Sequence, residues 1–167
     1  FPVVFVCGLS RIFSRESVKG QVLCDQSLGL GLAAVDEKNR GRYPTVAKQA
    51  IKAKILSDGL SEEMRVLYVA LTRARDRLIM TYASRTLEKD LSELALRMDV
   101  GDRELLIRDV VCPGEWVLMT ALRRTEAGEL FALSGCSKDS SPGLSPWLIR
   151  VVTAPNRTVR AQVQEEN

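Results

Sequence analysis

The stretch VLYVALTRARDRLIMTYA, residues 66–83, sets three arginines between two apolar runs. Helical spacing from Ser61 onward gives one apolar face, at i, i+3, i+4 and i+7, made of Met64, Leu67, Tyr68 and Leu71. A second, roughly opposite face is made of Val66, Val69 and Ala70 and ends at Arg73. We therefore expect a helix covered on both sides, with Tyr68 in the core. Residues 77–83 then predict a buried strand after a short turn near Asp76, as in α/β units.

The chain before this stretch predicts a strand-rich beginning and a helix. Residues 1–7 form an apolar run typical of a parallel strand covered on both faces. Residues 9–19 indicate a loop or short helix, residues 21–25 a short strand, residues 28–36 a glycine-bearing hairpin or loop, and residues 40–44 a turn. Residues 45–57 predict an amphipathic helix with lysines outward. We expect Gly59 to end it and Ser61, followed by Glu62 and Glu63, to start the next helix.

The pattern of predicted elements changes after Ser84. The sequence there predicts helices over 86–98 and 113–122, a strand or a helix over 103–111, and a hairpin of two strands over 129–135 and 147–154. We expect three parts: an α/β unit over 1–84, a smaller α+β extension over 85–153, and a disordered tail over 154–167.

Composition narrows the function classes. The 167 residues carry a net charge of +3, which permits an anionic partner without requiring one, and include no histidine. Ser-His and Cys-His catalysis are therefore excluded within this chain. None of the four cysteines stands at Cys-x-x-Cys spacing from another, so the sequence predicts no metal site. We expect Cys7 to be a small buried side chain, and all four cysteines, Cys136 included, to be reduced. No apolar run approaches a membrane span, so we expect a cytoplasmic protein. Phe1 stands where Met would open a gene product, so we expect a piece of a larger protein.

Two interpretations of the arginines stay open from the residues alone. Surface ion pairs with Glu62, Glu63 or Asp76 suit Arg75 and Arg77. Arg73 differs because small neighbours, Thr72 and Ala74, let another surface approach closely. A planar, permanently charged guanidinium at such a place suits a phosphate, and at an ATP held between two domains it acts as an arginine finger.

These residues resemble a known family. SEEMRVLYVALTRARDRLIMT, residues 61–81, closely resembles the sixth motif of superfamily 1 DNA helicases of the UvrD kind. FPVVFV, residues 1–6, resembles the strand directly after their fifth motif, and residues 28–74 resemble in particular the A subunit of AddAB-type helicase–nucleases. The resemblance is strong over residues 1–83 and weaker over 84–153.

The resemblance implies a fold and site residues. The fold is the C-terminal half of a RecA-like parallel sheet with helices, from the second such domain, followed by the α+β extension. Arg73 is the arginine finger that reaches ATP on the first RecA-like domain, and Thr72 supports its placement. Glu62 or Glu63, together with Arg65, make polar contacts around the nucleotide site.

The resemblance also implies cofactors and partners. ATP and Mg²⁺ belong to the full-length protein, which moves along single-stranded DNA, pairs with a second subunit, and carries a nuclease domain for double-strand-break processing and recombinational repair. This chain lacks the phosphate-binding loop, the magnesium-binding acidic pair, the fifth-motif glutamate and a nuclease carboxylate cluster. We therefore expect it to bind no cofactor and to be inactive alone.

Three further hypotheses remain. The first is a non-catalytic DNA-binding or protein-binding module derived from a helicase tail, with Lys48 and Lys52 on the basic helix as DNA contacts. The second is a helicase of the same superfamily without a nuclease domain. The third is a dimer of the chain, because half a sheet leaves an unpaired strand edge.

Overall fold

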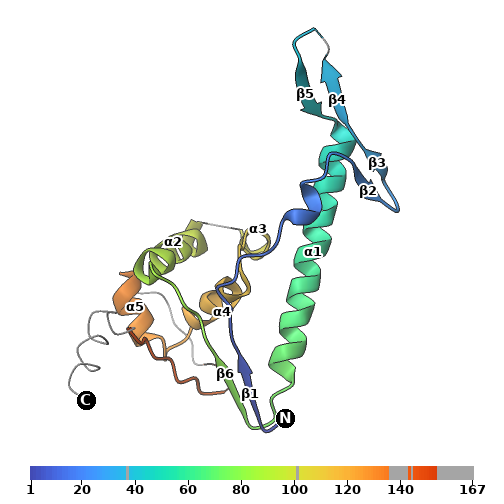
Figure 1. Ribbon diagram of the computed structural model, residues 1–167. Coiled ribbons are helices and arrows are strands. Elements are labelled where there is room, and N and C mark those ends of the chain that lie inside the picture. Colours follow the sequence, from blue (N-terminus) through green and yellow to red (C-terminus); the bar gives the residue numbers. More distant parts are fainter. Residues whose placement is uncertain (37, 101, 136–142, 144, 154–167) are drawn as a thin grey trace, which may run out of the picture.

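A single long helix, α1, joins an arm of small hairpins to a body of short helices (Figure 1). The computed structural model describes residues 1–153 except 37, 101, 136–142 and 144. The predicted tail, most of the segment that joins the two predicted hairpin strands, and Cys136 lie outside the described residues. In chain order the elements are β1 (Val3–Val6), η1 (Glu16–Val18), β2 (Leu23–Asp25), β3 (Gly29–Gly31), β4 (Ala33–Asp36), β5 (Gly41–Pro44), α1 (Val46–Thr72), β6 (Arg77–Met80), α2 (Leu87–Val100), α3 (Arg103–Arg108), α4 (Pro113–Ala121) and α5 (Gly128–Ser134).

Helix α1 is one uninterrupted element of 27 residues, about 40 Å long at the usual rise per residue. Thr45 is its N-cap, and the Thr45 hydroxyl accepts from the Lys48 backbone N–H at 3.2 Å. The expected break at Gly59 and the expected N-cap at Ser61 are wrong. Ser61 instead donates its hydroxyl to the Ser57 carbonyl inside the helix. A glycine in a helix interior costs only about 1 kcal/mol, which a long helix with packed faces can bear.

Strands β1 and β6 form a parallel pair, as predicted, with Val3 opposite Arg77 and Val6 opposite Met80. Along both strands exposed and half-buried residues alternate. The expectation that both faces are covered is therefore wrong: Phe5 stands 64% exposed on the open face, and Cys7, expected to be buried, is exposed. α1 contacts β1, and no third strand among the described residues joins this sheet.

The arm consists of η1, the antiparallel hairpins β2–β3 and β4–β5, and the first half of α1 (Figure 1). The strand predicted over 21–25 is confirmed as β2. Residues 28–36, predicted as a hairpin or loop, supply one strand to each of the two hairpins, and the turn predicted over 40–44 is strand β5. Gly31 is buried against α1, where an added Cβ would lie 2.7 Å from the Lys48 Cα. Ile51 of α1 is fully buried beneath this hairpin.

The body is helical. Its core is formed by α2, α4 and α5, which bury Leu91, Leu94, Ala95, Leu118, Ala121, Leu122, Ala127 and Leu130. The helices predicted over 86–98 and 113–122 are confirmed, and the ambiguous 103–111 contains helix α3. The predicted hairpin is wrong: residues 128–134 form α5, which ends at Gly135 in the left-handed conformation, and residues 145–153 have no regular structure. Within the described residues the extension is therefore helical rather than α+β.

None of the helices in the described part of the chain is both long enough and apolar enough to cross a membrane.

Candidate functional site

The turn after α1 is fixed to the start of β1 by backbone hydrogen bonds. The Arg73 carbonyl accepts from the nitrogen of Phe1 at 2.9 Å, and the Arg75 N–H donates to the Phe1 carbonyl at 2.8 Å. The next two backbone N–H groups, of Asp76 and Arg77, both donate to the Pro2 carbonyl at 3.0 and 2.9 Å. Arg73 itself caps the helix with right-handed backbone angles, and its N–H donates to the Ala70 carbonyl. The backbone that carries Arg73 is thus held from both sides.

The three arginines of this turn differ in their partners. Arg75 makes a two-pronged ion pair with Asp76, at 3.0 and 3.1 Å, which raises the pKa of the Arg75 guanidinium. This confirms the prediction of a paired Arg75. The side chains of Arg73 and Arg77 are exposed, and neither makes a hydrogen bond or ion pair to the residues that the structure describes. Arg73 therefore has all five of its N–H donors available to a partner from elsewhere.

The predicted supporting residues lie on the same helix as Arg73. The Thr72 hydroxyl lies 3.0 Å from the Tyr68 carbonyl and 3.1 Å from the Val69 carbonyl, so Thr72 bonds back onto its own helix. Arg65 pairs with Glu62 through two bonds of 2.8 and 2.5 Å, which lowers the pKa of Glu62 and raises that of Arg65. Arg65 precedes Arg73 by eight residues, about 12 Å along the axis.

Glu63 is exposed, with no ion pair among the described residues. The structure therefore places Glu63 and Arg65 about two helical turns before Arg73, not beside it.

Arg73 ends an outer stripe of α1 that is made of Val66, Val69 and Arg73. Val66 is 53% exposed and Val69 is 37% exposed. The expectation that both faces of this helix are covered is wrong for the outer stripe, because no other described element packs over it.

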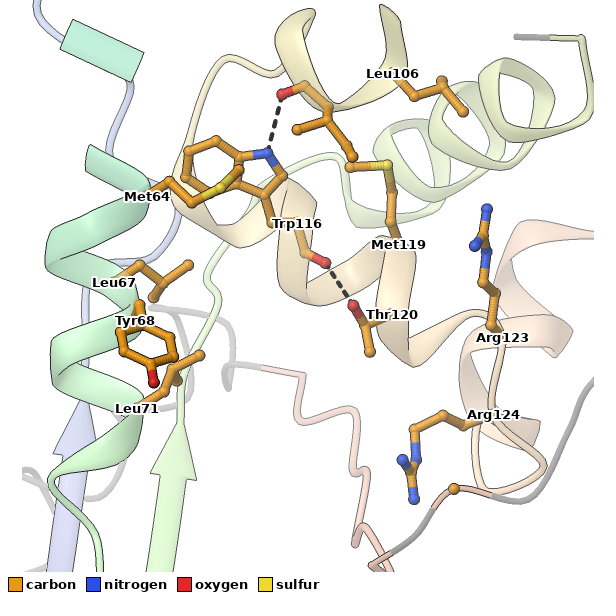
Figure 2. A pocket seen from close by; sticks show the side chains of 12 residues that line it. Met64, Leu67, Tyr68, Leu71, Leu106, Trp116, Met119, Thr120, Arg123 and Arg124 are labelled. Atoms are coloured by element: carbon orange, nitrogen blue, oxygen red, sulfur yellow. Dashed lines mark hydrogen bonds between the residues drawn. The ribbon is translucent and has the colours of Figure 1, made fainter. Parts of the chain in front are cut away.

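The opposite face of α1 borders a groove of about 570 Å³ (Figure 2). Leu67 and Leu71 point across it toward Trp116 and Met119 of α4. The Trp116 ring N–H donates to the Ile107 carbonyl at 3.1 Å, which ties α4 to α3. Tyr68, expected in the core, is 66% exposed, because α1 and α4 diverge and leave its ring at the groove. The groove therefore lies on the side of α1 away from Arg73.

A second cleft, of about 620 Å³, lies on the arm between η1, β5 and α1. It brings together Lys48 and Lys52, the two predicted DNA contacts, and adds Lys19, which the sequence pattern does not indicate. Because Lys19 lies 29 residues before Lys48 in the chain, no local spacing signals that they share a cleft.

An ion-pair cluster in the body also escapes prediction from the sequence. Arg124, 9% exposed, donates to Glu126 at 3.0 Å and to the Ser145 carbonyl, and stacks 4.7 Å from the centre of the Trp147 ring. Glu126 in turn accepts from the Trp147 N–H at 3.2 Å. The cluster holds the irregular segment 145–151 against the helical core. The only sequence signal is the Arg-Thr-Glu spacing directly before a helix.

Comparisons with known proteins show which helicase sequences this chain is similar to. Residues 25–85 match the UvrD-like helicase C-terminal domain. The A subunit of the ATP-dependent helicase/nuclease from Thermoanaerobacter sp. is 36% identical over 155 residues, covering 90% of this chain and 12% of that protein. The proteins of the same name from Clostridium acetobutylicum and Ruminiclostridium cellulolyticum are 33% identical over 161 residues and 49% identical over 89 residues. These matches cover 92% and 53% of this chain, and 13% and 7% of those two proteins.

The predicted resemblance to UvrD-like helicases, and to helicase/nuclease A subunits in particular, is confirmed by these matches. The chain spans at most 13% of the length of these curated relatives.

Proposed function

We propose that this chain forms the C-terminal part of the second RecA-like domain of an ATP-dependent DNA helicase–nuclease subunit, in which Arg73 is the arginine finger. The observation that carries the proposal is the state of Arg73. Its backbone is held by Phe1, which precedes strand β1, whereas its side chain is exposed and has no described partner. A fixed backbone with a free guanidinium is what a catalytic group supplied across a domain interface needs.

In this proposal the guanidinium donates to the γ-phosphate oxygens as negative charge develops there during hydrolysis. Its planar fork can make two parallel bonds to phosphate oxygens, which lysine cannot. The bidentate pair of Arg75 and Asp76 keeps the neighbouring cation away from the same phosphate. Thr72 secures the last turn of α1, and Glu63 and Arg65 make supporting contacts farther from the nucleotide. ATP and Mg²⁺ are held by the first RecA-like domain, because this chain lacks the loop and the acidic pair that bind them.

The whole protein, in the same proposal, moves along single-stranded DNA in the cytoplasm and cuts the strands that it separates. It acts with a second subunit in double-strand-break processing and recombinational repair, and the chain alone is inactive. The curated relatives support this proposal through their names, which describe them as ATP-dependent helicase/nuclease subunits.

The test is Arg73→Ala in the complete protein, assembled with its second subunit. We expect the DNA-stimulated ATPase kcat to fall about 10³-fold or more, the range found for arginine fingers, with ATP binding retained. Arg73→Lys should recover little, because it keeps the charge and loses the fork. The matched control is Arg75→Ala in the same turn, which should leave kcat near wild type because Arg75 is already paired with Asp76. Wild-type turnover in Arg73→Ala would remove the assignment.

A non-catalytic DNA-binding module is the second candidate function, and the basic cleft of Lys19, Lys48 and Lys52 favours it. The ATPase assay of Arg73→Ala also distinguishes the two candidate functions. If the chain is a non-catalytic module, the rate of ATP hydrolysis does not depend on Arg73.

A further inference from the structure

We propose that the arm binds the phosphate backbone of DNA along a track formed by Lys19, Lys52, Lys48 and Arg42. The inference rests on the proposed function, since it takes DNA as the substrate of the whole protein, and it assigns a contact surface far from Arg73.

Positive charge is concentrated in residues 11–54, a range that begins five residues before the arm and ends inside α1. Residues 11–54 hold nine Lys and Arg against four Asp and Glu, a net of +5, whereas the whole chain carries +3. The remainder of the chain is therefore net negative, at −2. A region of concentrated positive charge on a nearly neutral chain is the electrostatic footprint of a nucleic-acid contact.

The cleft on the arm presents three of these positive charges, because three lysines line it, and none of the described residues in its lining is acidic. Lys52 is exposed and makes no hydrogen bond or ion pair to any described residue. The Lys48 ammonium donates to a neutral group, the Gln21 carbonyl, at 2.7 Å and keeps its charge and its other donors. Lys19 pairs with Glu16, but both side chains are exposed, and a pair of that kind is weak enough to be exchanged for a phosphate.

Lys54, two residues after Lys52 on α1, differs from the cleft lysines. Its ammonium lies 2.7 Å from Asp25 and 3.1 Å from Asp58, and the hydrogen bond from Lys54 lowers the pKa of Asp25. Lys54 therefore holds the β2–β3 hairpin to α1 and is not free for a phosphate, whereas the cleft lysines are.

The β4–β5 hairpin continues the track beyond the cleft. Pro44 of β5 lines the cleft, and Arg42 stands two residues earlier on the same strand, so both side chains lie on one face of the hairpin. The exposed Arg42 is thus placed about 7 Å farther along that face. The hairpin projects beyond the start of α1, which lengthens the track outward (Figure 1).

One exposed apolar pair of the arm lies on a different side from the cleft. Cys24 and Leu30 are directly opposed on β2 and β3 and both are exposed. Their strand neighbours Leu23 and Gly31 are buried toward α1, so Cys24 and Leu30 point away from it. Because Lys48 and Lys52 lie on α1 itself, the cleft is separate from the Cys24–Leu30 pair. A cleft lined by three lysines and, among the described residues, no acidic one matches a phosphate backbone better than an apolar protein partner.

The test compares two triple variants of the complete protein, assembled with its second subunit but without nucleotide. Lys19→Gln/Lys48→Gln/Lys52→Gln removes the cleft charge, and Arg85→Gln/Lys89→Gln/Arg108→Gln removes the same charge from exposed sites of the body. Affinity for a fluorescent oligo(dT) of about 20 nucleotides and for the matching duplex is measured between about 50 and 200 mM salt. We expect the cleft triple to lose about tenfold or more at low salt and to flatten the slope of log K against log salt by about 2 for single strands.

The body triple should behave as wild type, and equal losses in both triples would overturn the proposal. If wild type binds the duplex more tightly than oligo(dT) and only the cleft triple loses this preference, the track is supported and duplex is the form of DNA that it binds. Retained DNA affinity with lost binding of the second subunit would overturn it in favour of a protein interface. Lys52→Glu alone, at a side chain without a described partner, repeats the test if the triple unfolds.

The test separates this inference from the proposed function. Cleft variants should raise the DNA concentration needed for half-maximal ATPase and leave kcat at saturating DNA unchanged, whereas Arg73→Ala should lower kcat and leave DNA affinity unchanged.

Discussion

Glu126 is the carboxylate of the ion-pair cluster in the body. The Arg124 guanidinium, and to a lesser extent the Trp147 N–H, lower the pKa of Glu126 from an ordinary 4.5 to about 2. A lowered folded-state pKa stabilises the fold above the ordinary value and loses that contribution as pH falls. We therefore expect the melting temperature to fall as the pH drops from about 4.5 to about 2, with a weaker fall in Glu126→Gln.

Circular dichroism melts across that pH range measure the effect. Glu93→Gln is the matched control, because Glu93 forms only an exposed pair with Lys89 at 3.6 Å and should keep the wild-type acid slope. Identical slopes for Glu126→Gln and wild type would show that Glu126 does not carry the acid sensitivity.

At the scale of the element, α1 offers a stabilising substitution at the residue expected to break it. Gly59 is exposed, lies inside the helix, and has no atom within 4 Å of an added Cβ. Gly59→Ala should therefore raise the free energy of unfolding by about 0.5–1 kcal/mol, since alanine restricts the unfolded chain and favours the helix. Gly31→Ala should destabilise, because its Cβ would meet the Lys48 Cα at 2.7 Å. Denaturant unfolding measures both, and a neutral or destabilising Gly59→Ala would contradict the account.

The elements differ in how far their sequences determine them. The two faces of α1 follow from the spacing of apolar residues alone. The different states of Arg75 and Arg73 also follow from the sequence, because Asp76 is adjacent to Arg75. Helix α5 is mistaken for a strand because seven residues of mixed apolar character do not distinguish a strand from a helix. The open sides of Cys7 and Tyr68 escape prediction for another reason. Burial depends on which elements close over a residue, and that is a property of tertiary packing.

The candidate sites show the same limit. Arg73 is distinguished by its neighbours along the helix, whereas the cleft with Lys19 and the groove between Leu67 and Trp116 join residues 29 or more positions apart. Periodicity cannot report such contacts. The excess of positive charge over residues 11–54 can be predicted from the sequence, because it requires only a count of charged side chains.

On the scale of the whole molecule, the chain has two separately packed parts joined by α1. Ile51, with no exposed surface, packs under the hairpin of the arm, and Leu122, 1% exposed, lies in the core of α2, α4 and α5. The first half of α1 touches η1, β2 and β3, whereas α2 contacts α4 and α5. The arm thus depends on a small core of its own, so we expect it to open independently of the body.

Hydrogen exchange of Ile51→Ala and Leu122→Ala tests this division. Each truncation of a buried side chain should cost about 2–5 kcal/mol, but in different places. Ile51→Ala should lower amide protection in β2, β3 and the first half of α1 and leave α2 and α4 protected, because the lost contacts lie in the arm. Leu122→Ala should do the reverse. If either variant lowers protection equally throughout, the two parts unfold as one cooperative unit, and the arm does not open independently of the body.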